Sequence, residues 1–167
     1  MTTSQHGSAV VTFPNDLEIV VVQRFDAPME LVFDVLSKPE HVLKWFAPFE
    51  DTMTECSIDF RVGGNYHMVF VTNDGTECSF RGTYLEIDSP TRTVETWLFE
   101  GWPDADAVET VTLHEADGVT TLTNSLAFRD QVGRDHMDKT DGFEDSFAKM
   151  DAYLRSLVDL KQTSSGT

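Results

Sequence analysis

Two polar side chains stand among apolar residues at the alternating spacing of β-strand positions. Asn124 falls between Leu122 and Leu126, and Glu86 shares a predicted strand face with Tyr84. A buried amide or carboxylate must find a hydrogen-bond partner, so each of these side chains could orient a bound ligand. Each could equally bond to a neighbouring backbone group. The pattern indicates ligand recognition at most, and it does not by itself indicate a reaction.

Recognisable catalytic spacings are absent from the sequence. No serine lies in a GxSxG motif, the histidines form no HExxH or paired pattern, and there is no P-loop or GxGxxG. We therefore expect no metal site and no cofactor. His41 is the one weak candidate for a general base, because histidine titrates near neutral pH. The alternative is that His41 is an ordinary surface residue of a helix.

Composition and charge narrow the class of protein. The 167 residues suit a single domain, and their net charge of −17 argues against binding to nucleic acid or to an anionic membrane surface. Twelve Phe and three Trp are many for this length. They predict either a solid aromatic core or a hollow lined by rings, and composition does not choose between the two.

The cysteines and the chain termini bear on location. Cys56 and Cys78 form no CxxC pair, and the first residues have neither a basic start nor a long apolar run. No window approaches the length of a membrane span. We expect a cytoplasmic protein with free thiols that is a monomer or a homodimer.

Hydrophobic periodicity predicts the elements that must position these residues. The stretch 17–25 is rich in β-branched residues and predicts a strand, and 29–37 and 38–46 predict two short helices. Apolar residues spaced by three and four predict a long amphipathic helix within 135–161. Six further strands are predicted between the short helices and the long one: 54–60, 65–71, 77–87, 93–100, 108–116 and 119–128.

This order of elements predicts an α+β fold. We expect a curved, seven-stranded antiparallel sheet wrapped around the long C-terminal helix, with the two short helices after the first strand. Residues 1–16 are expected to form a flexible arm, 17–161 a single domain, and 162–167 a disordered tail. A space between the curved sheet and the helix would be the place for a ligand.

A series of motifs in this order resembles a known superfamily. The motifs are RFDAPMELVFDVLSKPEHVLKWF, CSIDFRVGGNYHMVF, GTYLEIDSPTRTVETW, VTLHEADGVTTLTNSLAF and DGFEDSFAKMDAYL. Together they resemble the SRPBCC (START/Bet v-like) superfamily over about residues 17–160. Within it they are similar to the bacterial branch related to the C-terminal domain of Aha-type activators of the heat-shock chaperone ATPase. The resemblance implies a helix-grip fold whose cavity commonly holds an apolar small molecule.

Strand and helix faces then predict which side chains line that cavity. Most of them are aromatic, and two are the polar residues introduced above. The predicted ligand-binding residues are Trp45, Phe46, Phe49, Phe60, Tyr66, Met68, Phe80, Tyr84, Glu86, Trp97, Phe99, Asn124, Phe128, Phe143, Phe147 and Met150.

Three functions remain open on this sequence. The first is binding of an apolar small molecule, such as a lipid or a polyketide, without chemistry. The second is an enzyme like the polyketide cyclases and aromatases of the superfamily, which predicts a titratable side chain with a perturbed pKa inside the cavity. The third is a chaperone-partner module, which predicts an exposed functional surface patch instead. We favour the first.

Overall fold

The computed structural model describes residues 9–47, 51–101, 106–138 and 142–165, with the backbone alone for 136–138, 142–145 and 161–165. The described residues form eight strands and four helices. Along the chain these are β1 (Val10–Thr12), β2 (Glu18–Phe25), α1 (Met29–Ser37), α2 (Pro39–Trp45), β3 (Thr52–Ile58), β4 (Asn65–Val71), β5 (Glu77–Asp88), β6 (Arg92–Phe99), β7 (Ala107–Ala116), β8 (Val119–Phe128), α3 (Gln131–Asp138) and α4 (Gly142–Ser165).

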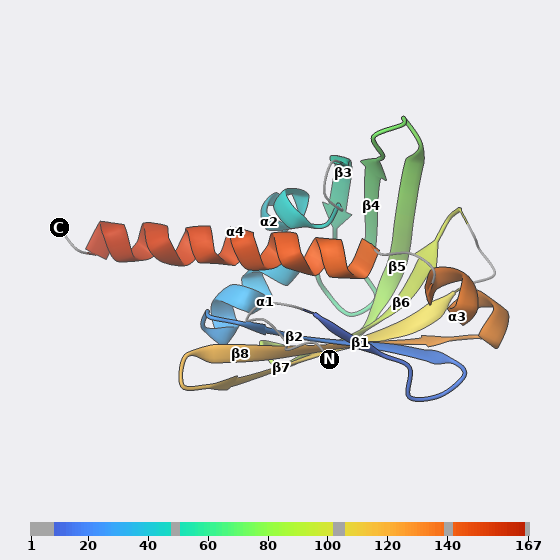
Figure 1. Ribbon diagram of the computed structural model, residues 1–167, viewed down its shortest axis with the longest axis horizontal. Coiled ribbons are helices and arrows are strands. Elements are labelled where there is room, and N and C mark those ends of the chain that lie inside the picture. Colours follow the sequence, from blue (N-terminus) through green and yellow to red (C-terminus); the bar gives the residue numbers. More distant parts are fainter. Residues whose placement is uncertain (1–8, 48–50, 102–105, 139–141, 166–167) are drawn as a thin grey trace.

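All eight strands belong to one antiparallel sheet, in the order β1-β2-β8-β7-β6-β5-β4-β3. Figure 1 shows that this sheet is strongly bent: β2, β7 and β8 run along the bottom of the molecule, while β3, β4 and β5 stand upright. The pairing register shifts between Met53 and Glu55 of β3 and between Tyr84 and Glu86 of β5. Such bulges bend a strand and increase its twist, so they help to curve the sheet.

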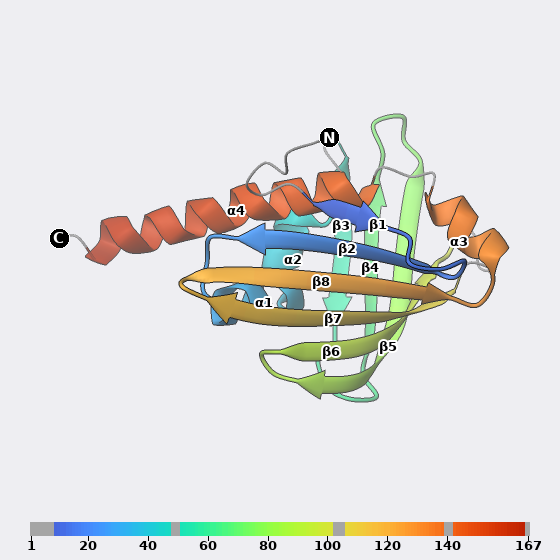
Figure 2. The same cartoon turned by 60° about the horizontal axis from the view of Figure 1, so that its bottom comes forward.

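Helices α1, α2 and α4 lie on the inside of this bend (Figure 1). α4 packs against α2, α1 and β2, and α1 also contacts β7 and β8. Figures 1 and 2 show α4 running across one side of the bent sheet, with α1 and α2 beside it. Alternate residues of β2 point into the core beneath them, which is why Ile19, Val21 and Phe25 are almost fully buried. The predicted α+β class is confirmed.

Three details of the predicted fold are wrong. The sheet has eight strands rather than seven, because residues 10–12, within the segment that was expected to be a flexible arm, form β1 and pair with β2. The residues expected to form one helix from 135 onwards belong to two helices, α3 and α4. α4 continues to Ser165, although 162–167 were expected to be a disordered tail. Short polar segments have weak periodicity, and contacts with neighbouring elements decide their structure.

The Gly63-Gly64 turn between β3 and β4 does more than reverse the chain. Gly63 has a φ of +86°, which an L side chain rarely adopts. Gly64 lies so close to the carbonyl oxygen of Asp59 that a Cβ atom would overlap it. The turn also bonds to Tyr84 of β5: Gly63 N donates to Tyr84 O at 2.8 Å, and Tyr84 N donates to Gly64 O at 2.9 Å. It therefore fixes the backbone of a residue that lines the cavity described next.

Candidate functional site

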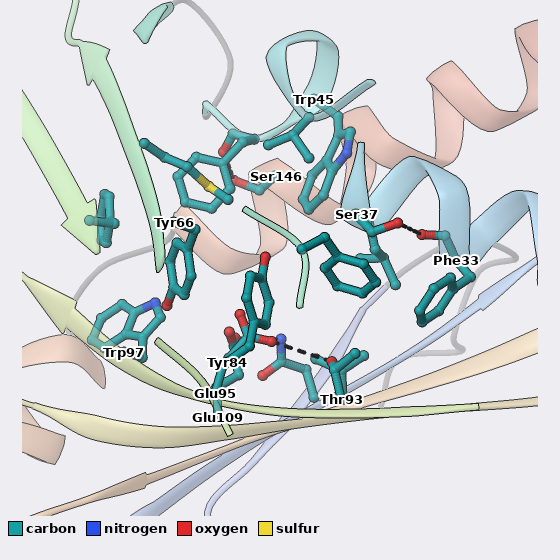
Figure 3. Close-up of a pocket in the computed structure, with 18 of the residues that line it drawn as sticks. Phe33, Ser37, Trp45, Tyr66, Tyr84, Thr93, Glu95, Trp97, Glu109 and Ser146 are labelled. Atoms are coloured by element: carbon teal, nitrogen blue, oxygen red, sulfur yellow. Dashed lines mark hydrogen bonds between the residues drawn. The ribbon is translucent and has the colours of Figure 1, made fainter. Parts of the chain in front are cut away.

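A cavity of about 160 Å³ lies in the angle of the sheet, between β4–β8 on one side and α1, α2 and α4 on the other. Figure 3 shows Tyr84, Glu95 and Glu109 close to the strands, and Trp45 and Ser146 on the opposite side. Most of the wall is aromatic or aliphatic, and the polar part is small. The lining residues are Phe33, Leu36, Ser37, Val42, Trp45, Phe46, Phe60, Tyr66, Met68, Phe70, Phe80, Tyr84, Arg92, Thr93, Glu95, Trp97, Glu109, Val111, Leu113, Asn124, Ser146 and Phe147.

Most of the residues predicted from strand and helix faces are brought together around this cavity. Strand alternation and the apolar stripe of α4 account for the agreement, because both decide which side chains face the inside of the bend. Their role as ligand contacts stays a prediction. The predicted residues in the wall are Trp45, Phe46, Phe60, Tyr66, Met68, Phe80, Tyr84, Trp97, Asn124 and Phe147.

Three predicted residues, two of them buried and one partly buried, lie near the cavity without lining it. The ring of Phe99 stacks on Phe80 with centroids 5.0 Å apart, and the ring of Phe128 packs edge-on against Trp97 at 5.9 Å. Both rings therefore contact residues of the wall without being part of it. Met150 is fully buried, one turn along α4 from the cavity, in the core. Alternation identifies the face of an element but not where along the element the open space ends.

The prediction for Glu86 is wrong. Its carboxylate accepts a hydrogen bond from Arg92 Nη1 at 2.8 Å, and its side chain is 61% exposed. The reason is the bulge between Tyr84 and Glu86, which inserts one extra residue into β5 and changes the face on which the following side chains lie. Beyond the bulge, Ile87 packs against the core instead.

His41 does not line the cavity either. Its Nδ1 lies 2.6 Å from the hydroxyl oxygen of Tyr153, so the pair connects α2 with α4. Tyr153 is therefore a structural partner for His41. Because His41 is not part of the cavity wall, there is no basis for its role as a general base in the cavity. Two other predicted contacts, Phe49 and the side chain of Phe143, lie outside the part of the chain that the structure describes.

A pair of carboxyl groups in the cavity was missed by the sequence analysis. Glu95 of β6 and Glu109 of β7 are directly opposite each other in the strand register, and their carboxyl groups share a hydrogen bond. Thr93 Oγ1 lies 3.3 Å from Glu95 Oε1, and Asn124 Nδ2 donates to Glu109 Oε2 at 2.8 Å. The remaining oxygen of Asn124, Oδ1, is buried without a hydrogen-bond partner.

The surroundings of this carboxyl pair oppose ionisation. Burial is the largest cause that raises the pKa of Glu95 well above its ordinary value, and the charge of Glu109 adds to it. Burial also raises the pKa of Glu109, although its hydrogen bonds with Asn124 and Glu95 act in the opposite direction. Glu109 is half-buried and lines the cavity. Two opposed carboxylates in an apolar site are stabilised by sharing a proton.

Two tyrosines lie beside the pair. Tyr84 is directly opposite Glu95 in the strand register, and Figure 3 shows its hydroxyl group pointing into the cavity. Tyr66 donates its hydroxyl hydrogen to the carbonyl oxygen of Thr96 at 2.7 Å. Burial, followed by the nearby carboxylates, raises the pKa of both phenols. Both therefore stay protonated near neutral pH.

The alternation used to select Trp97 contains the signal that would have identified this pair. Glu95 is two residues before Trp97 on the same face of β6, and Glu109 is two residues before Val111 on the same face of β7. A carboxylate in such a position predicts a buried charge. Among the described residues, no group of three or more acidic, histidine or cysteine side chains could hold a metal ion.

The sequence was compared with protein families and with curated proteins. Residues 26–155 match the family described as activator of Hsp90 ATPase homolog 1-like protein. The chain belongs to this family. The family is part of the SRPBCC superfamily, which confirms the resemblance noted from the motifs. Comparison with curated proteins gave no match.

Solved structures show the same fold. A protein from Rhodobacter sphaeroides has a TM-score of 0.82 at 18% identity, over 89% of this chain and 99% of that chain. CalU16 from Micromonospora echinospora has a TM-score of 0.61 at 22% identity, over 87% and 82% of the two chains. DynU16, a protein in the dynemicin biosynthetic locus, has a TM-score of 0.68 at 21% identity, over 85% and 48%. At these identities the likeness shows the fold alone.

Proposed function

We propose that this protein has the helix-grip architecture of its superfamily and binds an apolar small molecule in the cavity between the bent sheet and the helices. The observation that carries the proposal is a cavity of about 160 Å³ with a mainly aromatic wall. Protein interiors normally pack without open space of this size, and empty apolar space costs stability. A wall of rings that keeps such a space open is typical of a ligand site.

Filling the cavity tests this proposal. Val111→Phe on β7 adds a ring on the cavity side, and Val108→Phe adds the same ring on the outer side of the same strand, where Val108 is 42% exposed. Native mass spectrometry of the purified proteins should find a bound apolar compound on the wild type and on Val108→Phe, and none on Val111→Phe. Thermal unfolding checks that the variants fold, and Leu36→Phe repeats the test from α1. Equal occupancy in all variants would contradict the proposal.

A second candidate is an enzyme of the cyclase kind. The observation that favours it is the Glu95–Glu109 pair, since a carboxyl pair with raised pKa values inside a cavity is suited to give and take protons near neutral pH. Turnover of a set of cyclisable polyketides by the wild type, and at least a hundredfold slower turnover by Glu109→Gln, would support it. The matched control is Glu86→Gln, which changes the same group outside the cavity. Unchanged turnover in Glu109→Gln would exclude this role for the pair.

Two other expectations stay open. The chaperone-partner role rests on the family description alone. A cytoplasmic location is supported by the free thiols of Cys56 and Cys78.

Burial, and to a smaller degree Glu55, raises the pKa of the Cys56 thiol to about 11, which makes this thiol unreactive near neutral pH. No helix in the described residues is long and apolar enough to cross a membrane.

A further inference from the structure

The polar part of the cavity is rich in acceptors and poor in free donors. Asn124 is 8% exposed and uses its Nδ2 to donate to Glu109, while its Oδ1 has no partner. The hydroxyl group of Thr93 is already within hydrogen-bond distance of Glu95. What remains for a ligand is therefore mainly carboxyl oxygen and amide oxygen, together with the hydroxyl group of Tyr84, which points into the cavity (Figure 3). A buried acceptor without a partner is costly, so a ligand that donates hydrogen bonds would be favoured here.

No cation of the cavity wall neutralises this polar part. Arg92 is the single cationic side chain among the described residues of the wall, and its guanidinium bonds to Glu86 outside the cavity at 2.8 Å. The side chains that face the carboxyl pair are Tyr66 from β4, Tyr84 from β5, Thr93 from β6 and Asn124 from β8. The helices add the neutral hydroxyl groups of Ser37 and Ser146.

Aromatic rings surround the same space. Tyr84 packs edge-on against Phe60 at 5.0 Å and beside Tyr66 at 5.5 Å, and Trp97 packs beside Phe80 at 5.6 Å. The faces of such rings attract an organic cation, and they attract it more strongly where water is excluded. A carboxylate next to several rings is thus a suitable environment for an ammonium group, whereas an anionic ligand would meet charge of its own sign.

We propose that the ligand of this cavity is a small organic amine, whose ammonium group lies against Glu95, Glu109 and Asn124 Oδ1 and whose apolar body lies among the rings. The inference rests on the proposed binding function and adds the ligand class. The volume of about 160 Å³ suits a body of about one ring, since a cavity of about 150 Å³ in another protein holds benzene.

Three probes of similar shape separate charge from size. 2-Phenylethylamine, 2-phenylethanol and phenylacetate have the same ring with a cationic, neutral or anionic end. Isothermal titration calorimetry of the full chain at pH 8 should give an affinity for the amine at least about tenfold tighter than for the alcohol, because a charge-assisted hydrogen bond is stronger than a neutral one. Phenylacetate should bind more weakly than both.

Variants assign the preference to the carboxyl pair. Glu109→Gln and Glu95→Gln keep the size of the side chain and remove its charge, so each should reduce amine affinity at least about tenfold and leave alcohol affinity within about twofold. Glu86→Gln, on the outer face, should change neither. A folding defect would lower binding of amine and alcohol together, and the ratio between the two therefore isolates the effect of charge.

The pH dependence provides a second readout. An alkylamine stays protonated from pH 5 to pH 8, so any change in affinity over this range reports the protein. Because an ammonium group favours the ionised carboxylate, binding should release protons, and affinity for the amine should weaken from pH 8 to pH 5 in the wild type. Proton release is measured by repeating the calorimetry in buffers with different ionisation enthalpies, and it should fall in Glu109→Gln.

The outcomes separate this inference from the binding function. If the alcohol binds as tightly as the amine, or if Glu109→Gln leaves their ratio unchanged, the amine inference is wrong and the binding function stands. If none of the three probes binds and Val111→Phe still carries as much copurified compound as the wild type, both are wrong. An amine preference that depends on both carboxyl groups supports both.

Discussion

The outer and inner faces of β5 and β6 hold carboxyl groups in opposite environments. On the outer face, Glu86 is 61% exposed and has Arg92 as its partner at 2.8 Å. On the inner face, Glu95 is 9% exposed and lies directly opposite another acid, Glu109. The outer pair is screened by water and contributes little to stability. The inner pair is disfavoured by burial and by like charge, and it is retained in a cavity wall that could instead be apolar.

This contrast indicates what the inner pair is for. Replacing a buried charged group by an apolar one is often neutral or stabilising, so stability does not explain two opposed carboxyl groups. A site that must recognise a polar group of a ligand does explain them, because ligand sites commonly combine an apolar wall with a few placed polar groups. Three substitutions test the contrast through stability.

The largest effect is expected where the inner pair loses its hydrogen-bond donor. Asn124→Leu keeps the size of the side chain but removes the amide that donates to Glu109. We expect a loss of about 2 kcal/mol in the free energy of unfolding, because a buried carboxyl oxygen is left without its partner. Urea unfolding at pH 8 measures it. Thr123→Leu, the neighbouring outward position of β8, should change stability by about 0.5 kcal/mol or less; equal losses in the two variants would contradict this reasoning.

An intermediate effect is expected from the pH dependence. The folded pKa values of Glu95 and Glu109 are raised, so above the pKa of about 4.3 for an unfolded glutamate the folded state holds more protons than the unfolded state. Stability should therefore fall as the pH rises from 5 to 8. In Glu95→Gln this fall should be smaller by on the order of 1 kcal/mol. Thermal or urea unfolding across the pH range measures it.

The matched control for that experiment is Glu86→Gln. It removes the same charge from a protein of net charge −17, so it accounts for relief of general repulsion. If Glu95→Gln and Glu86→Gln reduce the loss of stability between pH 5 and pH 8 by the same amount, overall charge is responsible for that loss and the buried pair is not.

The smallest effect is expected on the outer face itself. Glu86→Gln breaks an exposed ion pair with Arg92, and it should change the free energy of unfolding by less than about 0.5 kcal/mol at pH 8. The difference from the wild type should shrink further in about 1 M salt, where the Debye length is about 3 Å. A loss comparable to that of Asn124→Leu would remove the contrast between the two faces.

Most of the fold and the aromatic part of the site could be predicted from local patterns. The period-two alternation of β4 placed Tyr66 and Met68 on one face, and the apolar stripe of α4 identified Phe147. Such patterns are reliable because burial of one face is what stabilises the element. The prediction failed at Glu86, because the bulge after Tyr84 leaves no local mark in the sequence.

The sequence by itself determined that most strands and the long C-terminal helix of this protein have an apolar face, in several cases rich in rings, and therefore that an α+β core would form. It also contained Glu95 and Glu109 on such faces, fourteen positions apart. Only the tertiary structure decided that the two acids meet, since the register of β6 with β7 is set by pairing along the whole of both strands. The tertiary structure also decided that the bend of the sheet leaves open space beside them, because curvature depends on bulges, such as the one after Tyr84, and on the packing of helices against the sheet.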